Sequence, residues 1–238
     1  MAAFAQKAEV GVTGGFASNT AATGSIYYVG DKPVQSFAGS ITFLANIPNT
    51  HFQLGADVYG LGLANKASKQ LDIPYFGRKL GGNGETFTYA KLAISVCPIF
   101  NYKLDFSEQG YVYGGLALGI AGSIADPQKA SNSDGSSVTF RGINGGFGFT
   151  GGGQLGACYA VTPRIALNAE VALRYYHLTF STSPSYPNGP SVDLNTLAYP
   201  ITFGIRYRMG FEKQLNYETG RYQIVRNKDR KYKAHAEK

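Results

Sequence analysis

From residue 197 to 211 every second residue is apolar or aromatic, which is the pattern of a β-strand with two different faces. One face is apolar or aromatic and carries Leu197, Tyr199, Ile201, Phe203, Ile205, Tyr207, Met209 and Phe211. The positions between them include Thr202, Gly204, Arg206 and Arg208. A tilted strand of about 9–11 residues suffices to cross a hydrocarbon layer. The segment therefore predicts a membrane-spanning strand that closes a barrel.

Seven further segments alternate in the same way, so the chain predicts eight strands. Their ranges are 7–18, 36–47, 51–63, 85–103, 110–123, 145–160, 164–178 and 197–211. The connections are alternately long and short, and the short ones are residues 48–50, 104–109 and 161–163. Short turns at one end, long loops at the other and an even number of strands are typical of outer-membrane barrels, whose short turns face the periplasm. We predict an all-β fold, an eight-stranded antiparallel up-and-down transmembrane β-barrel with long extracellular loops.

The composition agrees with many short strands. The 238 residues include 31 Gly, 17 Tyr and 15 Phe, and only 16% of the residues are charged. No apolar run approaches the ~18 residues that a membrane helix needs. The mean hydropathy of −0.14 is compatible with a membrane barrel, because lipid-facing and lumen-facing residues alternate and their average looks soluble.

Charged residues at the polar positions of the strands distinguish a membrane barrel from a soluble one. They are Glu9, Asp57, Lys91, Glu170, Arg174, Arg206 and Arg208. A lipocalin-like barrel would turn its apolar faces inward around a ligand and carry abundant Lys and Glu outside. Acids and bases spread over different strands instead predict a mutually neutralising network inside the barrel, since buried charges persist when they are paired. Such a network would fill most of the lumen, and a narrow low-conductance channel is the alternative.

The chain divides into three parts: residues 1–6, the barrel at 7–211, and a basic tail at 212–238. Ala3-Phe4-Ala5 resembles the small-x-small end of a signal-peptide cleavage site. Residues 1–6 are therefore interpreted as the remnant of a signal peptide, with an ordinary N-terminal extension as the alternative. Of the net charge of +7, +4 lies in the tail, which has eight Lys or Arg and four Asp or Glu. The barrel itself has no basic stripe, which argues against a nucleic-acid partner.

The tail combines basic and aromatic residues and would emerge on the periplasmic side. The candidate partner-binding residues are Arg221, Tyr222, Arg226, Lys228, Arg230, Lys231, Tyr232 and Lys233. One interpretation is a solvated, disordered extension. The other is a docking segment for a periplasmic protein, for peptidoglycan or for a neighbouring subunit, and the apolar residues among the charges favour a protein.

The strand number, the loop asymmetry and the last strand, Tyr199-Pro-Ile-Thr-Phe-Gly-Ile-Arg-Tyr-Arg-Met-Gly-Phe211, resemble the small outer-membrane barrels of the OmpA-like and opacity-protein superfamily. The resemblance covers about residues 7–211. It implies an integral protein of the Gram-negative outer membrane, in contact with outer-membrane lipid and lipopolysaccharide. In that superfamily a closing strand ending in Phe is the insertion signal, whereas this chain continues after Phe211. Such barrels serve as adhesins, anchors, small pores and enzymes, so the resemblance implies a fold more than a function.

His177 is the candidate catalytic residue, at the predicted outer rim with Thr179 on the same lipid-facing side. The placement resembles lipid A deacylases of this barrel class, which carry a His-x-Ser pair and an acidic partner. That resemblance implies that Asp193 polarises His177 to activate a hydroxyl nucleophile. This chain has Thr179 in place of Ser, Phe180 where Asn usually follows, and Asp193 in place of Glu. The leading interpretation is a non-enzymatic structural or interaction protein, with a lipid A-modifying hydrolase as the alternative.

Cofactor and metal sites are not predicted. The three His residues are scattered at 51, 177 and 235, and their spacing matches no metal site. Residues 146–151 satisfy G-x-G-x-x-G but fall inside a predicted strand, where a dinucleotide fingerprint does not belong. Cys97 and Cys158 both fall on inward positions, so they form either a bridge across the barrel floor or two buried free thiols.

Overall fold

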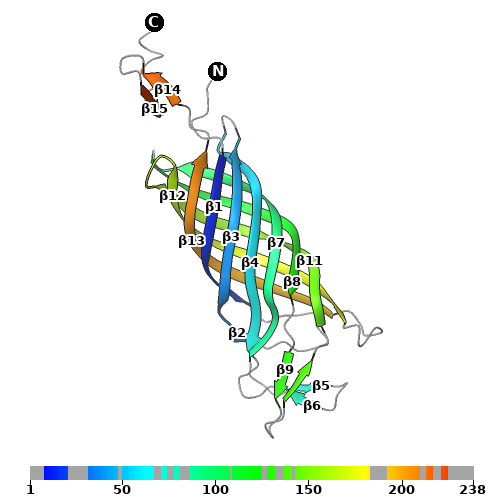
Figure 1. Cartoon of the computed structure of the whole chain (residues 1–238). Coiled ribbons are helices and arrows are strands. Elements are labelled where there is room, and N and C mark those ends of the chain that lie inside the picture. The colour runs from blue at the N-terminus through cyan, green and yellow to red at the C-terminus, as the bar shows by residue number, and fades with distance from the viewer. Residues whose placement is uncertain are drawn as a thin grey trace.

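A computed structural model describes residues 8–20, 32–47, 50–66, 71–73, 78–80, 86–107, 109–124, 128–131, 137–140, 143–182, 192–209, 213–216 and 221–224. Eight long strands form a closed barrel (Figure 1): β1 (Ala8–Asn19), β3 (Ser36–Asn46), β4 (Phe52–Lys66), β7 (Thr86–Asp105), β8 (Gly110–Ile124), β11 (Ile143–Ala160), β12 (Ile165–Thr182) and β13 (Val192–Met209). The sheet runs β4-β3-β1-β13-β12-β11-β8-β7, and β4 also pairs with β7. Every neighbouring pair in the barrel is antiparallel. The predicted fold class is confirmed.

The two faces of each strand have opposite surroundings. On β8, Leu116 and Leu118 are 63% and 70% exposed, whereas Ala117 between them is 1% exposed. The same alternation places Phe203 outside and Arg206 inside on β13. A continuous exterior of large apolar side chains fits a hydrocarbon environment and would be a liability in water. The strands therefore span a membrane, and closure of the sheet leaves no unpaired edge to lipid. Among the described residues there is no helix long and apolar enough to do so.

Short strands lie beyond both ends of the barrel. At one end, β2 (Lys32–Pro33) pairs with β4, β5 (Leu71–Ile73) with β6 (Arg78–Leu80), and β9 (Gln128–Ser131) with β10 (Ser137–Phe140). At the other end, where β13 stops and β1 starts, β14 (Lys213–Asn216) pairs with β15 (Arg221–Ile224) (Figure 1). Segments predicted as loops and as a tail therefore contain short hairpins.

The last strand begins earlier than the sequence pattern predicts. It was predicted at 197–211 and runs from Val192 to Met209, while its partner β12 continues to Thr182 instead of ending at residue 178. The reason is that inward-facing Leu178 and Leu194 are both apolar and pair directly across the two strands. Here apolar residues face inward and polar residues such as His177 and Asn195 face outward, so the pattern of the membrane-spanning part is inverted, although the hydrogen-bonded ladder goes on. Phe211 lies outside the described residues.

Two prolines interrupt the hydrogen-bonded ladder in the middle of the wall. Pro98 leaves a gap between β7 and β8, and Pro200 leaves one between β12 and β13, although the register is the same before and after each gap. On their other sides these prolines stay paired, Pro98 with Ala56 and Pro200 with Ala17. Because proline has no N–H group, it can support the ladder on one side only.

Candidate functional site

A network of ion pairs fills the half of the lumen near the short turns. Glu9 on β1 is 1% exposed, and its Oε2 accepts hydrogen bonds from the Tyr111 hydroxyl at 2.5 Å and from Arg206 Nη1 at 3.4 Å. Arg208 Nε lies 3.9 Å from the other oxygen of Glu9. Tyr111 belongs to β8, on the opposite wall from β1. The network therefore ties opposite walls together across the lumen.

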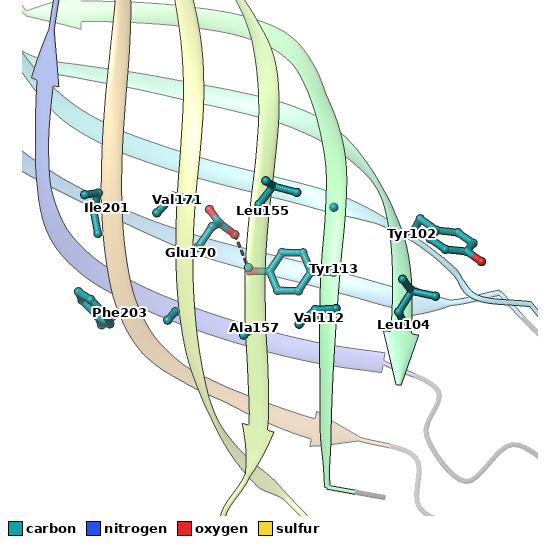
Figure 2. Close-up of a pocket in the computed structure, with 13 residues that line it drawn as sticks. Tyr102, Leu104, Val112, Tyr113, Leu155, Ala157, Glu170, Val171, Ile201 and Phe203 are labelled. Carbon is teal, nitrogen blue, oxygen red and sulfur yellow. Dashed lines mark hydrogen bonds between the residues drawn. The ribbon is translucent and has the colours of Figure 1, made fainter. Parts of the chain in front are cut away.

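Tyr113 on β8 reaches over β11 to a carboxylate on β12. Its hydroxyl lies 2.7 Å from Glu170 Oε2 and 3.1 Å from Asn168 Oδ1, as Figure 2 shows for Glu170. Gly156 is the register partner of Tyr113 on one side and of Glu170 on the other. A Cβ atom at Gly156 would lie 2.3 Å from Cζ of Tyr113. The tyrosine can therefore cross the strand because residue 156 has no side chain. The Arg206 guanidinium lies over the same ring, 4.4 Å from its centroid.

A second ion pair bridges the middle of the lumen. Arg174 Nη2 on β12 lies 3.1 Å from Asp57 Oδ2 on β4, which is again the opposite wall. The same nitrogen donates to Gln154 Oε1 at 2.7 Å. Thr42 donates to the other oxygen of Asp57 at 3.2 Å. Both charges are almost completely buried, and buried charges of opposite sign in contact stabilise each other against desolvation.

The half of the lumen away from the short turns holds an apolar cluster beside a few buried polar groups such as Asn19 and Thr196, and the sequence analysis did not predict this cluster. Leu61 and Leu63 from β4, Leu178 and Phe180 from β12 and Leu194 from β13 point inward and belong to one buried cluster. The sequence did contain a signal for this apolar cluster, because the alternation that places Asp57 and Tyr59 inside the barrel also places Leu61 there. The described lumen is thus occupied by ion pairs in one half and by an apolar layer in the other.

The predicted interior charges can now be placed. Glu9, Asp57, Glu170, Arg174, Arg206 and Arg208 are all buried inside the barrel. The side chain of Lys91 lies outside the described residues. Of the candidate tail residues, Arg221 and Tyr222 belong to β15. The others, Arg226, Lys228, Arg230, Lys231, Tyr232 and Lys233, lie outside the described residues.

The predicted catalytic arrangement at the outer rim differs from the observed one. Asp193 Oδ1 accepts a hydrogen bond from the Thr179 hydroxyl at 2.7 Å. His177 Nδ1 lies 2.7 Å from Asn195 Oδ1 instead. The register explains the difference, because Thr179 stands opposite Asp193 and His177 stands opposite Asn195. The prediction that Asp193 polarises His177 is therefore corrected: the acid holds the hydroxyl of Thr179, and an amide orients the imidazole.

Metal and disulfide chemistry find no support in the described part of the chain. No group of three or more His, Cys, Asp or Glu side chains comes together there. Cys97 and Cys158 are free and buried, and they belong to two different apolar clusters. Of the two alternatives for the cysteines, the structure has the free thiols.

The outer surface of the wall is hollowed over β8, β11 and β12. A depression of about 620 Å³ forms where small residues such as Gly114, Ala157 and Ala169 lie between larger ones such as Leu104 and Phe203 (Figure 2). A neighbouring depression of about 650 Å³ lies over Gly115 and Gly153. The β8–β11 ladder is continuous behind both. They are therefore features of the lipid-facing surface and do not lead into the lumen.

No protein-family model and no curated protein matches the sequence. Solved structures with a similar architecture include Neisserial surface protein A (NspA), with 14% identity over 85% of this chain and 97% of that one and a TM-score of 0.47. The outer membrane protein OprG from Pseudomonas aeruginosa has 14% identity over 86% and 97%, with a TM-score of 0.48. The outer membrane protease OmpT from Escherichia coli has 10% identity over 88% and 99%, with a TM-score of 0.43.

These similarities are too distant to transfer a function, and they include both a protease and a surface protein. The assignment to the outer membrane rests on the chain's own features. A closed barrel of antiparallel strands, an apolar exterior, short turns at one end and long connections at the other form the architecture of an outer-membrane β-barrel.

Proposed function

We propose that the chain is a non-enzymatic structural or interaction protein of the OmpA-like type, in which the barrel is an anchor. The long connections present a surface outside the cell, and residues 212–238 bind a periplasmic partner. The observation that carries the proposal is the filled lumen. Tyr111 with Glu9 and Arg174 with Asp57 join opposite walls, and the apolar layer closes the other half.

The two halves of the lumen oppose permeation by different physical means. Removing one partner of a buried ion pair leaves an uncompensated charge, at a cost of about 3–5 kcal/mol, so the network resists opening. A hydrophobic constriction excludes water and ions by dewetting. The apolar layer around Leu61 and Leu178 is such a constriction. Both properties favour an anchor over a channel.

The tail hairpin supports the binding part of the proposal. β14 and β15 pair over four residues each and form a separate two-stranded sheet. An isolated hairpin of two strands is at best marginally stable in water. We infer that a partner stabilises it, either a periplasmic protein or peptidoglycan. Arg221 and Tyr222 on β15 supply a charge and an aromatic ring, residue types that are enriched at protein interfaces.

The test is cross-linking in cells followed by purification of the barrel. The full chain is compared with a chain that ends at Phe211 and with a matched control whose residues 212–238 are replaced by a Gly/Ser segment of equal length. Outer-membrane fractionation first establishes that all three are inserted. The proposal expects one partner that is enriched with the full chain and lost in both variants. Identical profiles for the three chains would rule out a binding role for the tail.

A further inference from the structure

A patch of polar side chains interrupts the apolar exterior at the outer ends of β12 and β13. Its residues, here named the rim patch, are Tyr175, His177, Thr179, Asp193 and Asn195. All of them are partly or fully exposed on the outward face. On β12 the outward residues nearer the middle of the membrane are Val171 and Leu173. On neighbouring β11, Phe147 and Phe149 stand opposite Thr179 and His177, at the level of the rim patch. On β12 the rim patch therefore begins where the aliphatic outward residues end, and we place it at the depth of lipid headgroups.

Hydrogen bonds within the rim patch use the side-chain donors of Tyr175, His177 and Thr179 and leave acceptors on His177 and Asp193. Asn195 Oδ1 lies 2.7 Å from both the Tyr175 hydroxyl and His177 Nδ1. An amide oxygen only accepts, so the proton of the neutral imidazole is on Nδ1 and Nε2 presents a lone pair. The hydroxyl proton of Thr179 goes to Asp193 Oδ1, which leaves the second carboxylate oxygen to accept. The patch thus offers two acceptors, from His177 and from Asp193, to a ligand that donates.

Aromatic rings stand beside these acceptors. The Phe149 ring lies 4.8 Å from the His177 imidazole, and it lies 6.2 Å from the Tyr175 ring. Phe149 is 54% exposed, so its ring offers an apolar surface next to the acceptors. A sugar ring has both complementary features, because its hydroxyl groups donate and its C–H face is apolar. A bare phosphate would meet a carboxylate and a lone pair, which repel it.

We propose that the rim patch binds the uncharged sugar headgroup of an outer-leaflet glycolipid. A sugar hydroxyl donates to Asp193 Oδ2, a second donates to His177 Nε2, and the Phe149 ring lies against the sugar. The acyl chains extend over the apolar face of β12. This site lies at the opposite end of the barrel from the tail and does not depend on the partner of the tail. Either proposal can therefore be refuted while the other stands.

The test measures lipid binding to the full chain in nanodiscs of phosphatidylcholine that contain a small fraction of glucosyl diacylglycerol. Native mass spectrometry after release from the nanodisc counts retained glycolipid. Asp193→Leu and His177→Phe each remove one acceptor. A net hydrogen bond contributes about 0.5–1.5 kcal/mol, so each variant should bind about two- to tenfold more weakly. Heat-dependent gel mobility and far-UV circular dichroism verify that the variants fold.

A matched control exists at the other rim, where the Tyr159 hydroxyl donates to Gln109 Oε1 at 2.6 Å. Gln109→Leu removes that outward polar group and should leave glycolipid retention unchanged. Equal retention of phosphatidylcholine and glucosyl diacylglycerol would overturn the proposal. It would also be overturned if phosphatidylethanolamine competed equally, because an ammonium donor would then suffice, or if only phosphorylated lipid A were retained.

Discussion

The crossing of Tyr113 over Gly156 gives a sharp prediction for Gly156→Ala. The added Cβ would lie 2.3 Å from Cζ and 2.4 Å from the hydroxyl of Tyr113, so the ring must leave its place. It then loses the hydrogen bond to the Glu170 carboxylate and the contact with the Arg206 guanidinium. The first is worth about 1.5–3 kcal/mol and the second about 0.5–2 kcal/mol. We expect a loss of about 2–4 kcal/mol of unfolding free energy, a large share of the ~5–15 kcal/mol typical of proteins.

The assay is urea unfolding of the barrel in detergent micelles, followed by far-UV circular dichroism because the chain has no Trp. With an m-value of about 1–3 kcal/mol/M, the midpoint should fall by about 1–2 M. Gly153→Ala on the same strand is the matched control. Its Cβ would meet only Gly115 O, at 3.7 Å, an ordinary contact, so the midpoint should stay the same or rise slightly.

A double variant tests the reasoning directly. In a Tyr113→Ala background the ring is gone, so Gly156→Ala should change the unfolding free energy by less than about 0.5 kcal/mol. If Gly156→Ala is as stable as Gly153→Ala, or if its cost is the same with and without the Tyr113 ring, the crossing does not determine the stability of this wall.

The ion pairs, the lumen and the cysteines yield three further predictions. Arg174→Met should cost about 3–5 kcal/mol in urea unfolding because it leaves Asp57 buried without its cation, and adding Asp57→Asn should recover more than half of the loss; no recovery would contradict the pairing. Arg206→Ala should leave planar bilayers without steady conductance, because the apolar layer is untouched, and a persistent open current would refute the barrier role of that layer. Cys97 and Cys158 should resist thiol reagents in the folded barrel and both react after denaturation; protection of either thiol in the unfolded, non-reduced chain would indicate a disulfide.

Alternation alone was sufficient to predict the barrel, because each strand separates lipid from lumen and the two solvents select different residues. The same logic placed residues such as Glu9, Asp57 and Arg206 inside. It failed at the outer ends of β12 and β13, where apolar residues face inward and polar residues face outward, so these ends and the layer around Leu178 were missed. Alternation also could not predict which residues on neighbouring strands contact each other. A register shift of two residues decides whether Asn195 or Asp193 faces His177, and no residue pattern within one strand encodes that choice.

The different fillings of the two halves of the lumen make the permeability barrier redundant. A substitution that breaks the ion pairs around Glu9 leaves the apolar layer in place, and one that creates a void near Leu178 leaves the charged network in place. A leak therefore requires coordinated changes in both halves, which single mutations do not supply. The connections outside the cell can then vary in sequence without risk to the membrane seal. In evolution and in engineering alike, such a barrel is a robust frame on which new surface segments can be exchanged.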